Sequence, residues 1–406
     1  MPKNNLHTIS KNGRPIYLDY QATTPLYPQV LDAMMPYFTE KFGNPHSQGH
    51  CYGWETEEAV EVARRSIADL IGASNKEIIF TSGATESNNL AIKGIAQLQK
   101  SNKSGKIKNH IITCVTDHEC VLESCIALEQ EGFEVTYLPV SKSGLINLNH
   151  LKDAITDRTN LVTIMSVNNE IGVIQPLAEI GNICRERGIF FHTDAAQAVG
   201  KIPINVDEMS IDLLSISSHK NYGPNGIGAL YIRRRPRVRL ASLMSGGGQE
   251  QNIRSGTVAT PLSVGFGKAA EISALEMEKE ALRLHRLRER FLEKLHFNTK
   301  EFKINGDLIN RIPGNLNLSF PGIMADNLMV GLKNLAFSSG SACSSGSKAP
   351  SHVLKALGIS DDLSAATIRI GFGYFTSEQD MDFAAECIAK EVNRQRVKPR
   401  YRAPAA

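Results

Sequence analysis

Short apolar runs recur through the first part of the chain at intervals that suit strands. Seven of them are strand candidates, and several of these are β-branched and nearly continuous in apolar character, which is typical of strands buried on both faces of a sheet. They are residues 78–80, 111–115, 135–139, 161–167, 189–193, 213–217 and 229–232. We therefore expect these seven runs to form one sheet.

Amphipathic segments fill the intervals between these runs. In residues 56–71 the apolar side chains fall on one stripe of a helix, and Gly72 follows as a stop signal. Residues 86–100, 121–131 and 177–187 have the same periodicity. Because strands alternate with helices, the pattern predicts an α/β fold with a mostly parallel, seven-stranded sheet.

The pattern changes after Thr257. Residues 261–295 are helical in period and dense in charge, and they are followed by strand candidates at 315–320 and 367–371 and a helix candidate at 381–393. We expect a large domain over residues 17–260 and a smaller α+β domain formed by residues 1–16 and 261–395. Residues 396–406 are basic and contain proline, and we expect them to be a disordered tail.

Composition narrows the class of protein. A net charge of +3 over 406 residues gives no reason to propose a membrane or nucleic acid as the main partner. Seven scattered cysteines are not a disulfide framework and indicate a reducing compartment, where most of them are expected to be buried and inert. Residues 1–14 lack the apolar core of a signal peptide. We expect a cytoplasmic protein, with the matrix of a mitochondrion or related organelle as the alternative.

One lysine stands directly after a strand candidate. Lys220 ends the stretch Ser217-Ser218-His219-Lys220, and a lysine in a partly desolvated site can lose its proton and form a Schiff base. The alternative is a strand-end lysine that reaches solvent, and Lys220 alone does not separate the two.

An aspartate follows the strand candidate that precedes the one before Lys220. Asp194 and Gln197 follow the strand candidate at 189–193, at the edge where ligands of open parallel sheets gather. A pyridoxal phosphate (PLP) ring needs an acid at its pyridine nitrogen, and a nearby amide can donate to its phenolic oxygen. A helix N-cap aspartate is the alternative; the spacing to Lys220 favours the cofactor.

Two further segments carry candidate chemistry. Residues 81–88 place small and hydroxyl side chains between a strand and a helix, which suits either a phosphate or an ordinary capped helix. Cys343 lies in a run of serine and glycine at 338–347. A thiol in such a loop can be exposed and nucleophilic, and can accept and pass on sulfur. The alternative is a linker with an incidental cysteine.

Taken together, these segments resemble the cysteine desulfurases, a branch of the fold-type I PLP-dependent transferases. The likeness covers residues 17–391 and includes the stretches at 18–25, 42–47, 81–88, 167–172 and 254–257, the turns of Asp194 and Lys220, and the Cys343 loop. The Ser-Ser-Gly-Ser-Ala-Cys form of that loop is similar to the long-loop group, which supplies sulfur for iron–sulfur clusters and tRNA thiolation.

The resemblance implies a cofactor role for most of the candidate residues. Lys220 would carry PLP as a Schiff base, Asp194 would pair with the ring nitrogen, and His118 would stack on the ring and move protons. The remaining cofactor contacts would come from Ala84, Thr85, Asn169, Gln197, Ser217 and His219, with Thr257 reaching the phosphate of the partner subunit of a homodimer.

The resemblance also implies the reaction. L-cysteine, bound by Asn169 and by Arg369 at its carboxylate, would become L-alanine while Cys343 keeps the sulfur as a persulfide. The sulfur would pass to an iron–sulfur scaffold protein or to other acceptors. Cys343 would be a metal ligand only for a cluster shared with such a scaffold. The chain's C-terminal tail does not resemble the tail that helps relatives dock a scaffold.

Two other functions remain open at this point. A selenocysteine lyase or cysteine lyase-like reaction would use the same Lys220, Asp194 and His118, whereas Cys343 favours persulfide chemistry. A non-catalytic sulfur-assembly subunit is the third hypothesis, and intact Lys220 and Cys343 argue against it. The basic run at 233–239 is interpreted as a solvated surface or interface, so nucleic acid would be met only indirectly.

Overall fold

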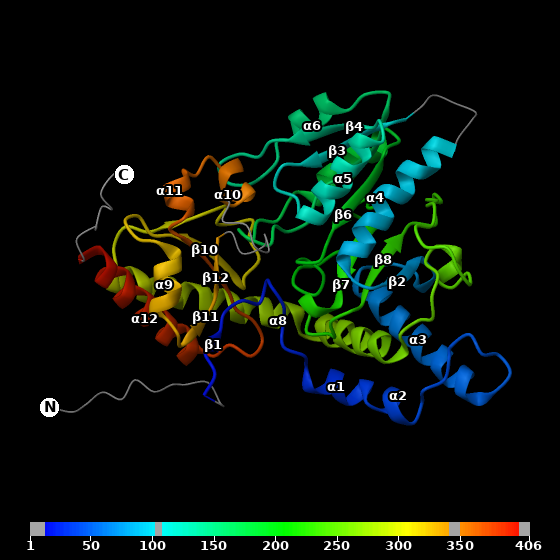
Figure 1. The fold of residues 1–406 in the computed structure, drawn as a ribbon, viewed down its shortest axis with the longest axis horizontal. Coiled ribbons are helices and arrows are strands. Elements are labelled where there is room, and N and C mark those ends of the chain that lie inside the picture. The colour runs from blue at the N-terminus through cyan, green and yellow to red at the C-terminus, as the bar shows by residue number, and fades with distance from the viewer. Residues whose placement is uncertain (1–12, 102–107, 341–349, 398–406) are drawn as a thin grey trace, which may run out of the picture. The chain divides into compact units, whose positions relative to one another are not determined.

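The computed structural model describes residues 13–101, 108–340 and 350–397, drawn as a ribbon in Figure 1. The described residues form two compact units. Residues 23–169 and 173–278 make the large unit, and the remaining described residues make the small unit. These units are groups of residues that are close in space, so the expected domain limits at 17–260 and 261–395 stay a prediction.

The large unit is built on the predicted sheet. Its strands lie in the order β2-β8-β7-β6-β5-β3-β4. The strands are β2 (Ile78–Thr81), β3 (His110–Cys114), β4 (Glu134–Leu138), β5 (Thr159–Thr163), β6 (Phe190–Asp194), β7 (Leu213–Ser217) and β8 (Gly228–Ile232). Pairing is parallel from β4 to β7, whereas β8 runs antiparallel to both of its neighbours. The mostly parallel seven-stranded sheet is therefore confirmed.

Burial explains why these segments are strands. Every residue of β2, β3, β5, β7 and β8 is buried, as expected for a sheet covered on both faces. The run predicted as a strand at 161–167 is offset, because β5 begins at Thr159 and ends at Thr163. The following residues leave the ladder and include the bridge between Val167 and Ile174.

The helices of the large unit are α1 (Pro28–Met34), α2 (Pro36–Thr39), α3 (Cys51–Leu70), α4 (Ala84–Ser101), α5 (Glu119–Gln130), α6 (Leu148–Ala154) and α7 (Leu177–Glu186), with short 3-10 turns η1 (Asn75–Glu77), η2 (Ser218–Lys220) and η3 (Glu250–Asn252). Helices α4, α5 and α7 begin and end within two residues of the predicted segments, and α3 begins five residues before its predicted start. No prediction was made for α1, α2 or α6. Helices α4 and α5 pack side by side against the sheet, as Figure 1 shows. Leu90, Ile95 and Val121 on these helices pack with Ile111 and Leu213 of the strands in one apolar core.

The small unit is an α+β assembly. Its antiparallel sheet has the order β12-β13-β10-β9. The strands are β9 (Lys303–Ile304), β10 (Asn315–Ser319), β12 (Ser338–Ser339) and β13 (Thr367–Gly371), and β1 (Ile16–Tyr17) pairs in parallel with β11 (Leu335–Ala336). Helices α9 (Ala325–Gly331), α10 (His352–Ala356), α11 (Asp361–Ser364) and α12 (Glu378–Val397) complete it. Its core includes Leu18, Leu316, Phe320, Ile368 and Ile388.

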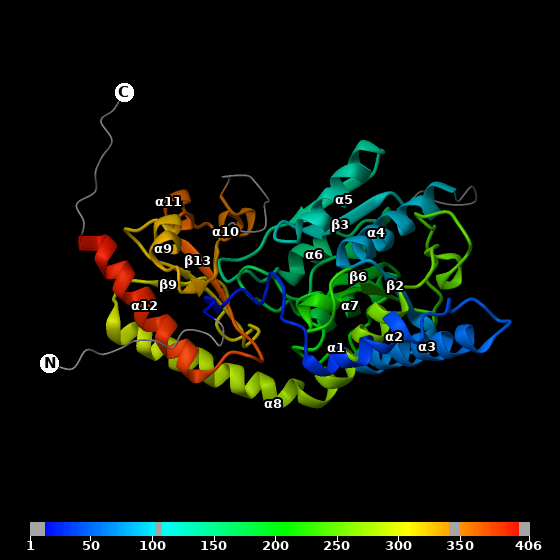
Figure 2. The ribbon, with the colours of Figure 1, turned by 60° about the horizontal axis from the view of Figure 1, so that its bottom comes forward.

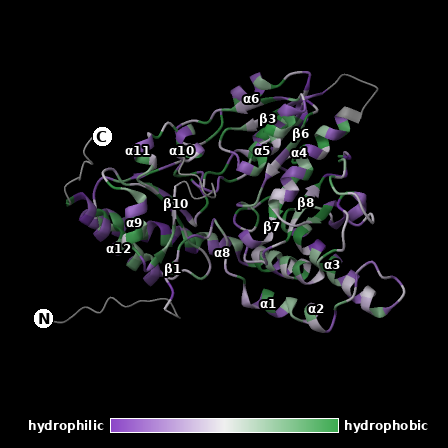
Figure 3. Cartoon of the chain, viewed as in Figure 1, coloured by the Kyte–Doolittle hydropathy of each residue, from purple (hydrophilic) through white to green (hydrophobic). Residues whose placement is uncertain are grey.

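The long helix α8 (Thr260–Asn298) contributes residues to both units, and Figure 2 shows its length. Helix α12 extends to Val397, so Arg396 and Val397 are helical rather than part of the predicted tail; the rest of that tail lies outside the described residues. In Figure 3, hydrophilic and hydrophobic residues alternate along α4 and α12. Within the described part of the chain, no helix combines the length and apolar character needed to cross a membrane.

Candidate functional site

Four strands bring the candidate residues of the large unit to one edge of the sheet. Gly228, at the start of β8, pairs with Ser217 on one side and with Thr81 on the other. Asp194 at the end of β6 pairs with Ser215 of β7. The carboxyl ends of β2, β6 and β7 therefore meet, and the turns that follow them lie next to one another. This is the edge at which open parallel sheets bind ligands.

The turn that carries Lys220 is fixed by a segment far away in sequence. Lys220 is the last residue of η2, and the buried carbonyl of Ser218 accepts the N–H groups of Asn221 and Gly223. The N–H and Oγ1 of Thr24 donate to the His219 carbonyl at 2.9 and 3.0 Å, and Thr24 Oγ1 accepts the Tyr222 N–H at 2.7 Å. Lys220 is half-buried on a hydrogen-bonded 3-10 turn that follows β7.

Basic groups cluster around this turn. Burial, together with the charges of Lys220 and Lys201, lowers the pKa of His219 to about 4. Burial, together with the charge of Lys220, lowers the pKa of Lys201 to about 7. His219 Nδ1 lies 3.0 Å from Thr23 Oγ1. An anion bound among these groups would relieve their repulsion.

Asp194 is buried and held at both oxygens. Its Oδ2 accepts from Asn88 Nδ2 at 2.7 Å, and its Oδ1 accepts the Ala196 N–H at 2.9 Å. Residues 196–200 form a turn rather than a helix. The alternative of a helix N-cap at Asp194 is therefore wrong, because the residue accepts a hydrogen bond from the N–H of a turn residue, Ala196. Gln197 is buried in the same turn.

His118 occupies the N-cap of α5, after β3. Its Nδ1 accepts the backbone N–H of Cys120 at 3.2 Å. Because that amide only donates, Nδ1 is an acceptor and the proton of the neutral ring sits on Nε2. The turn is anchored by the fully buried Asp117, which accepts from Thr113 Oγ1 at 2.8 Å and from the Met165 N–H at 2.6 Å.

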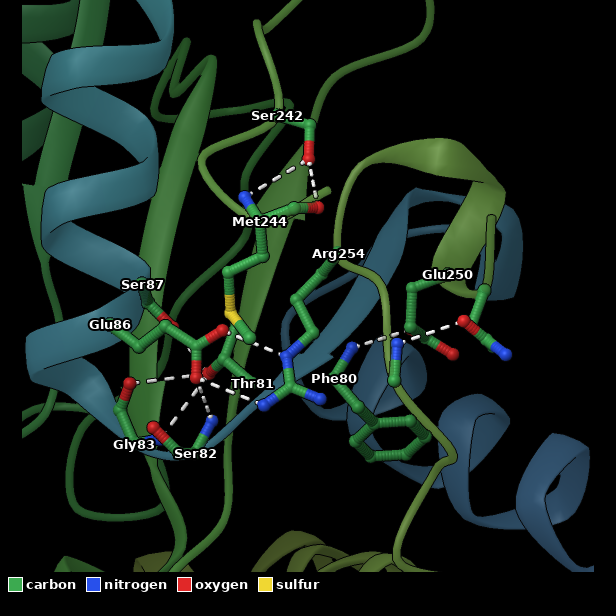
Figure 4. Close-up of polar contacts among 12 residues, drawn as sticks. Phe80, Thr81, Ser82, Gly83, Glu86, Ser87, Ser242, Met244, Glu250 and Arg254 are labelled. Atoms are coloured by element: carbon green, nitrogen blue, oxygen red, sulfur yellow. Dashed lines mark hydrogen bonds and ion pairs between the residues drawn. The ribbon is translucent and has the colours of Figure 1, made fainter. Parts of the chain in front are cut away.

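The turn between β2 and α4 is stabilised by an ion pair. Arg254 Nε donates to Glu86 Oε1 at 2.8 Å, and Glu86 Oε2 accepts the Ser82 N–H at 2.6 Å, as Figure 4 shows. Burial alone would raise the pKa of Glu86, but the hydrogen bonds from Arg254 and Ser82 outweigh it and lower this pKa below its ordinary value. Ala84 and Thr85 open α4 directly after this turn.

A second, buried ion pair holds the segment that leads to Arg254. Glu250 accepts from Arg64 Nη1 and Nη2, each at 2.8 Å, and from the Phe80 N–H at 2.6 Å. Sequence reasoning missed Glu250 and Arg64, and it also gave no role to Thr24 or Asp117. Nothing in the sequence around Glu250 and Arg64 pointed to their pairing, since they lie 186 positions apart.

The remaining predicted residues fall in different places. Asn169 is buried beyond β5, and Thr257 is exposed on the segment after Arg254. Arg369 lies on β13 of the small unit, where its Nη2 donates to Asp19 Oδ1 at 2.8 Å. Cys343 lies outside the described residues.

The other cysteines differ in how far they are buried. Cys114, Cys125 and Cys184 are buried, as expected, whereas Cys51 is exposed. Burial raises the pKa of Cys120, the cysteine beside His118, to about 12, which makes it a poor nucleophile at neutral pH. Among the described residues, no group of histidine, cysteine and acidic side chains has the arrangement of a metal site.

Comparison with known proteins identifies the family. Residues 16–383 match the model of the aminotransferase class-V family. The chain is 59% identical over 382 residues to a protein of Rickettsia typhi named cysteine desulfurase IscS, covering 94% of this chain and 92% of the relative.

Solved structures agree with this match. A structure titled NifS-like protein superposes with a TM-score of 0.86 at 34% identity, covering 94% of this chain and all of the other. Another, titled SspA in complex with cysteine, gives a TM-score of 0.78 at 41% identity, covering 89% of this chain and all of the other. The chain belongs to the cysteine desulfurase branch of the class-V aminotransferase family.

Proposed function

We propose that this cysteine desulfurase is a PLP enzyme that converts L-cysteine to L-alanine and keeps the sulfur as a persulfide on Cys343. The observation that carries the proposal is the meeting of three turns at one sheet edge: the Lys220 turn, the Asp194 turn and the turn that opens α4. An amine, a buried carboxylate and a helix N-terminus in that arrangement suit an aldehyde, a pyridine nitrogen and a phosphate, respectively.

The residues present fit PLP. The cluster of Lys201, His219 and Lys220 favours an anionic ligand, because burial and mutual repulsion lower the pKa of Lys201 and of His219. Lys220 would hold the aldehyde carbon and Asp194 the ring nitrogen. The phosphate would be held by Ala84, Thr85, Ser217 and His219, with Thr257 from the other subunit. When bound, PLP supplies an electron sink that acidifies the α-carbon of an amino acid.

The protein side chains would move the protons. Once free, the Lys220 amine would take the α-proton of L-cysteine at its Nζ. His118 presents Nε2–H in its neutral form, so it donates rather than accepts at that atom. It would therefore contribute a hydrogen bond from Nε2, while Lys220 would act as the base.

Sulfur transfer uses the protein thiol. The Cys343 thiolate attacks the substrate sulfur, an S–S bond forms, and the bond between the substrate sulfur and its carbon breaks. The electron pair of that bond stays on the carbon side, which gains a proton and leaves as alanine. The sum is L-cysteine plus Cys343 thiol giving L-alanine plus Cys343 persulfide, with no external oxidant.

Arg369 would bind the substrate carboxylate. It is buried and its Nη2 donates to Asp19 Oδ1 at 2.8 Å. A guanidinium can bind a carboxylate through two parallel hydrogen bonds, which suits this role. Asn169 would lie near the substrate and the phenolic oxygen.

We further propose a homodimer. Apolar side chains lie exposed on α1, α2, α3 and the loop before α3, including Phe38, Phe42 and Trp54 at 54, 66 and 55% exposure. They adjoin a groove of about 580 Å³ lined partly by Val264 and Gly267 of α8. Exposed apolar surface of this kind supports a protein partner. A second copy of this chain is the partner we propose, because Thr257 can contact the phosphate of another subunit only in a homodimer.

The persulfide would serve acceptors elsewhere in the cell. We propose an iron–sulfur scaffold protein as the main acceptor and a tRNA-thiolation protein as another, with Cys343 touching a metal only in a cluster shared with the scaffold. The bacterial relatives support a cytoplasmic site of action. Pull-down of the scaffold protein from the same organism, with and without residues 398–406, would test the first partner.

The test of the reaction is a product balance. Purified protein is mixed with L-cysteine and a reductant, and alanine and sulfide are measured. Equal amounts from the wild type, with loss of both in Lys220→Ala and in Cys343→Ala, are expected. Cys51→Ala is the matched control, because Cys51 is an exposed thiol remote from the site in sequence. Undiminished turnover in Cys343→Ala would overturn the persulfide step and favour a lyase.

A further inference from the structure

Asn88 joins two parts of the candidate site that come from different elements. It lies in the second turn of α4 and is fully buried. Its Nδ2 donates to Asp194 Oδ2 at 2.7 Å, at the end of β6, and to Cys120 Sγ at 3.1 Å, in the first turn of α5. The same sulfur lies 3.1 Å from His118 Nδ1. These four side chains therefore form one continuous chain of polar contacts.

The chemistry of the groups fixes the direction of each hydrogen bond at Asn88. A carboxylate only accepts, so the NH₂ group of the carboxamide must face Asp194, and its second hydrogen then faces Cys120. The Asn88 Oδ1 is buried and meets no donor among the described residues. The contacts to Asp194 and Cys120 alone therefore determine which way this carboxamide faces.

The direction is also fixed at the other end of the chain. His118 Nδ1 accepts the backbone N–H of Cys120 at 3.2 Å, so it carries a lone pair rather than a proton. The Cys120 sulfur accepts from Asn88, and its own hydrogen is then directed to Nδ1. Burial raises the pKa of Cys120 to about 12, so at neutral pH the thiol keeps the hydrogen that it donates. The chain ends with the His118 proton on Nε2.

We propose that Asn88 and Cys120 are positioning residues of the desulfurase site, which hold the Asp194 carboxylate and the His118 imidazole in one hydrogen-bonded chain. The inference rests on the proposed function, in which Asp194 pairs with the ring nitrogen of PLP and His118 stacks on the ring. It makes one prediction about His118 in the cofactor-free protein and another about cofactor affinity.

The first prediction is tested without cofactor. The full-length protein is labelled with carbon-13 and nitrogen-15 in its eleven histidines, freed of PLP and studied by solid-state NMR at alkaline pH. The spectrum of His118→Gln identifies the His118 signals by difference, and the bonded carbons distinguish the two ring nitrogens. We expect a protonated Nε2 and an unprotonated Nδ1.

Substitution of Cys120 tests whether its thiol contributes to this state. Serine keeps a donor and an acceptor, whereas alanine is close to serine in size and has neither. In Cys120→Ala the Nδ1 signal should move to lower field, because an accepting nitrogen that loses a hydrogen bond is deshielded. Cys120→Ser should return it toward its wild-type position. Cys125→Ala is the matched control, since it removes a buried thiol of the same helix that lies in the apolar core.

The second prediction is tested by titrating the proteins with PLP. Asn88→Leu should weaken PLP binding about tenfold, the cost of about one net hydrogen bond. In an Asp194→Ala background the same substitution should cost less than about threefold, because the contact that it removes is already gone. Asn88→Ala replaces Asn88→Leu if that variant does not fold, as judged by circular dichroism.

A proton on His118 Nδ1 in the wild type would overturn the inference. So would an Nδ1 signal that stays in place in Cys120→Ala or fails to return in Cys120→Ser, or an equal effect of Asn88→Leu with and without the Asp194 carboxylate. The NMR spectra require no cofactor, so they decide the matter even if the wild-type protein did not bind PLP; that result would overturn the proposed function alone.

Discussion

The buried ion pair between Glu250 and Arg64 makes a sharp prediction about stability. Their side chains are buried and joined by two contacts of 2.8 Å, and Arg64 Nη1 also donates to the Ile78 carbonyl at 2.8 Å. Burial alone would lower the pKa of Arg64, but Glu250 raises it above its ordinary value. Breaking a buried ion pair by removing one partner costs about 3–5 kcal/mol. Glu250→Gln would leave the Arg64 guanidinium only its ion pair with the more exposed Glu61, at 2.9 Å. Glutamine keeps one acceptor, so we expect about 3 kcal/mol.

The pair also holds an unusual backbone. Glu250, Gln251 and Asn252 have φ values of 46, 59 and 64°, and non-glycine residues in this region cost about 1 kcal/mol each. Once Glu250 no longer binds Arg64 and the Phe80 N–H, we expect this strained segment to relax. The loop that carries Arg254 and Thr257 should then become more accessible to a protease.

The assay is urea unfolding of the full-length protein, followed by circular dichroism, with limited proteolysis in parallel. Glu134→Gln is the matched control, because Glu134 forms an exposed ion pair with Arg158 in the same unit, and such pairs contribute at most about 1 kcal/mol. A loss below about 1 kcal/mol in Glu250→Gln, equal to that of the control, would refute the reasoning.

Three further changes test other parts of the account. Burial lowers the pKa of His192 to about 3 from its ordinary 6.5. Between these two pH values the unfolded chain binds a proton at His192 and the native state does not, so the free energy of unfolding should fall as pH drops from 6.5 toward 3. His192→Gln should reduce the slope of unfolding free energy against pH by about 1.4 kcal/mol per pH unit in this range. Thr24→Val should cost about 1–3 kcal/mol and weaken PLP binding, because it deletes the hydroxyl that joins the Lys220 turn. In Gly228→Ala the new Cβ would meet the Gly83 backbone at 2.6 Å, so PLP binding should weaken at least about tenfold through the displaced phosphate turn.

Each of these has a result that would contradict it. Parallel curves of unfolding free energy against pH for the wild type and His192→Gln would show that this imidazole is not the group responsible. Thr24→Ser should retain the stability that Thr24→Val loses, and equal losses would point to packing rather than the hydroxyl. Unchanged PLP affinity in Gly228→Ala would separate the turn after β2 from the phosphate.

The fold was predictable because five of the seven strands of the large unit are buried along their whole length. Such segments are continuous apolar runs, and the helices between them carry a clear stripe, as in α3 and α4. Two-residue strands such as β9 and β11 are too short to produce a periodic signal. The end of the run at 161–167 could not be placed, because buried loop residues there are as apolar as strand residues.

The site was predictable only where chemistry follows a strand. Asp194 is the last residue of β6 and Lys220 lies three residues beyond the end of β7. In parallel sheets the carboxyl ends of the strands meet at one edge, which is where ligands bind. Thr24 reaches the Lys220 turn from 195 positions away, and Glu250 reaches Arg64 across a similar gap. Contacts of this kind depend on the folded backbone, and no local pattern in the sequence predicts them.

The central claim is that sulfur from L-cysteine is held on Cys343, and one measurement tests it most directly. The protein is mixed with one equivalent of L-cysteine without reductant, and the thiols are alkylated and mapped by mass spectrometry while alanine is counted. The account predicts one extra sulfur atom on the Cys343 peptide, one alanine per modified chain, and no extra sulfur on the exposed Cys51. Alanine formed without added sulfur on Cys343 would contradict it.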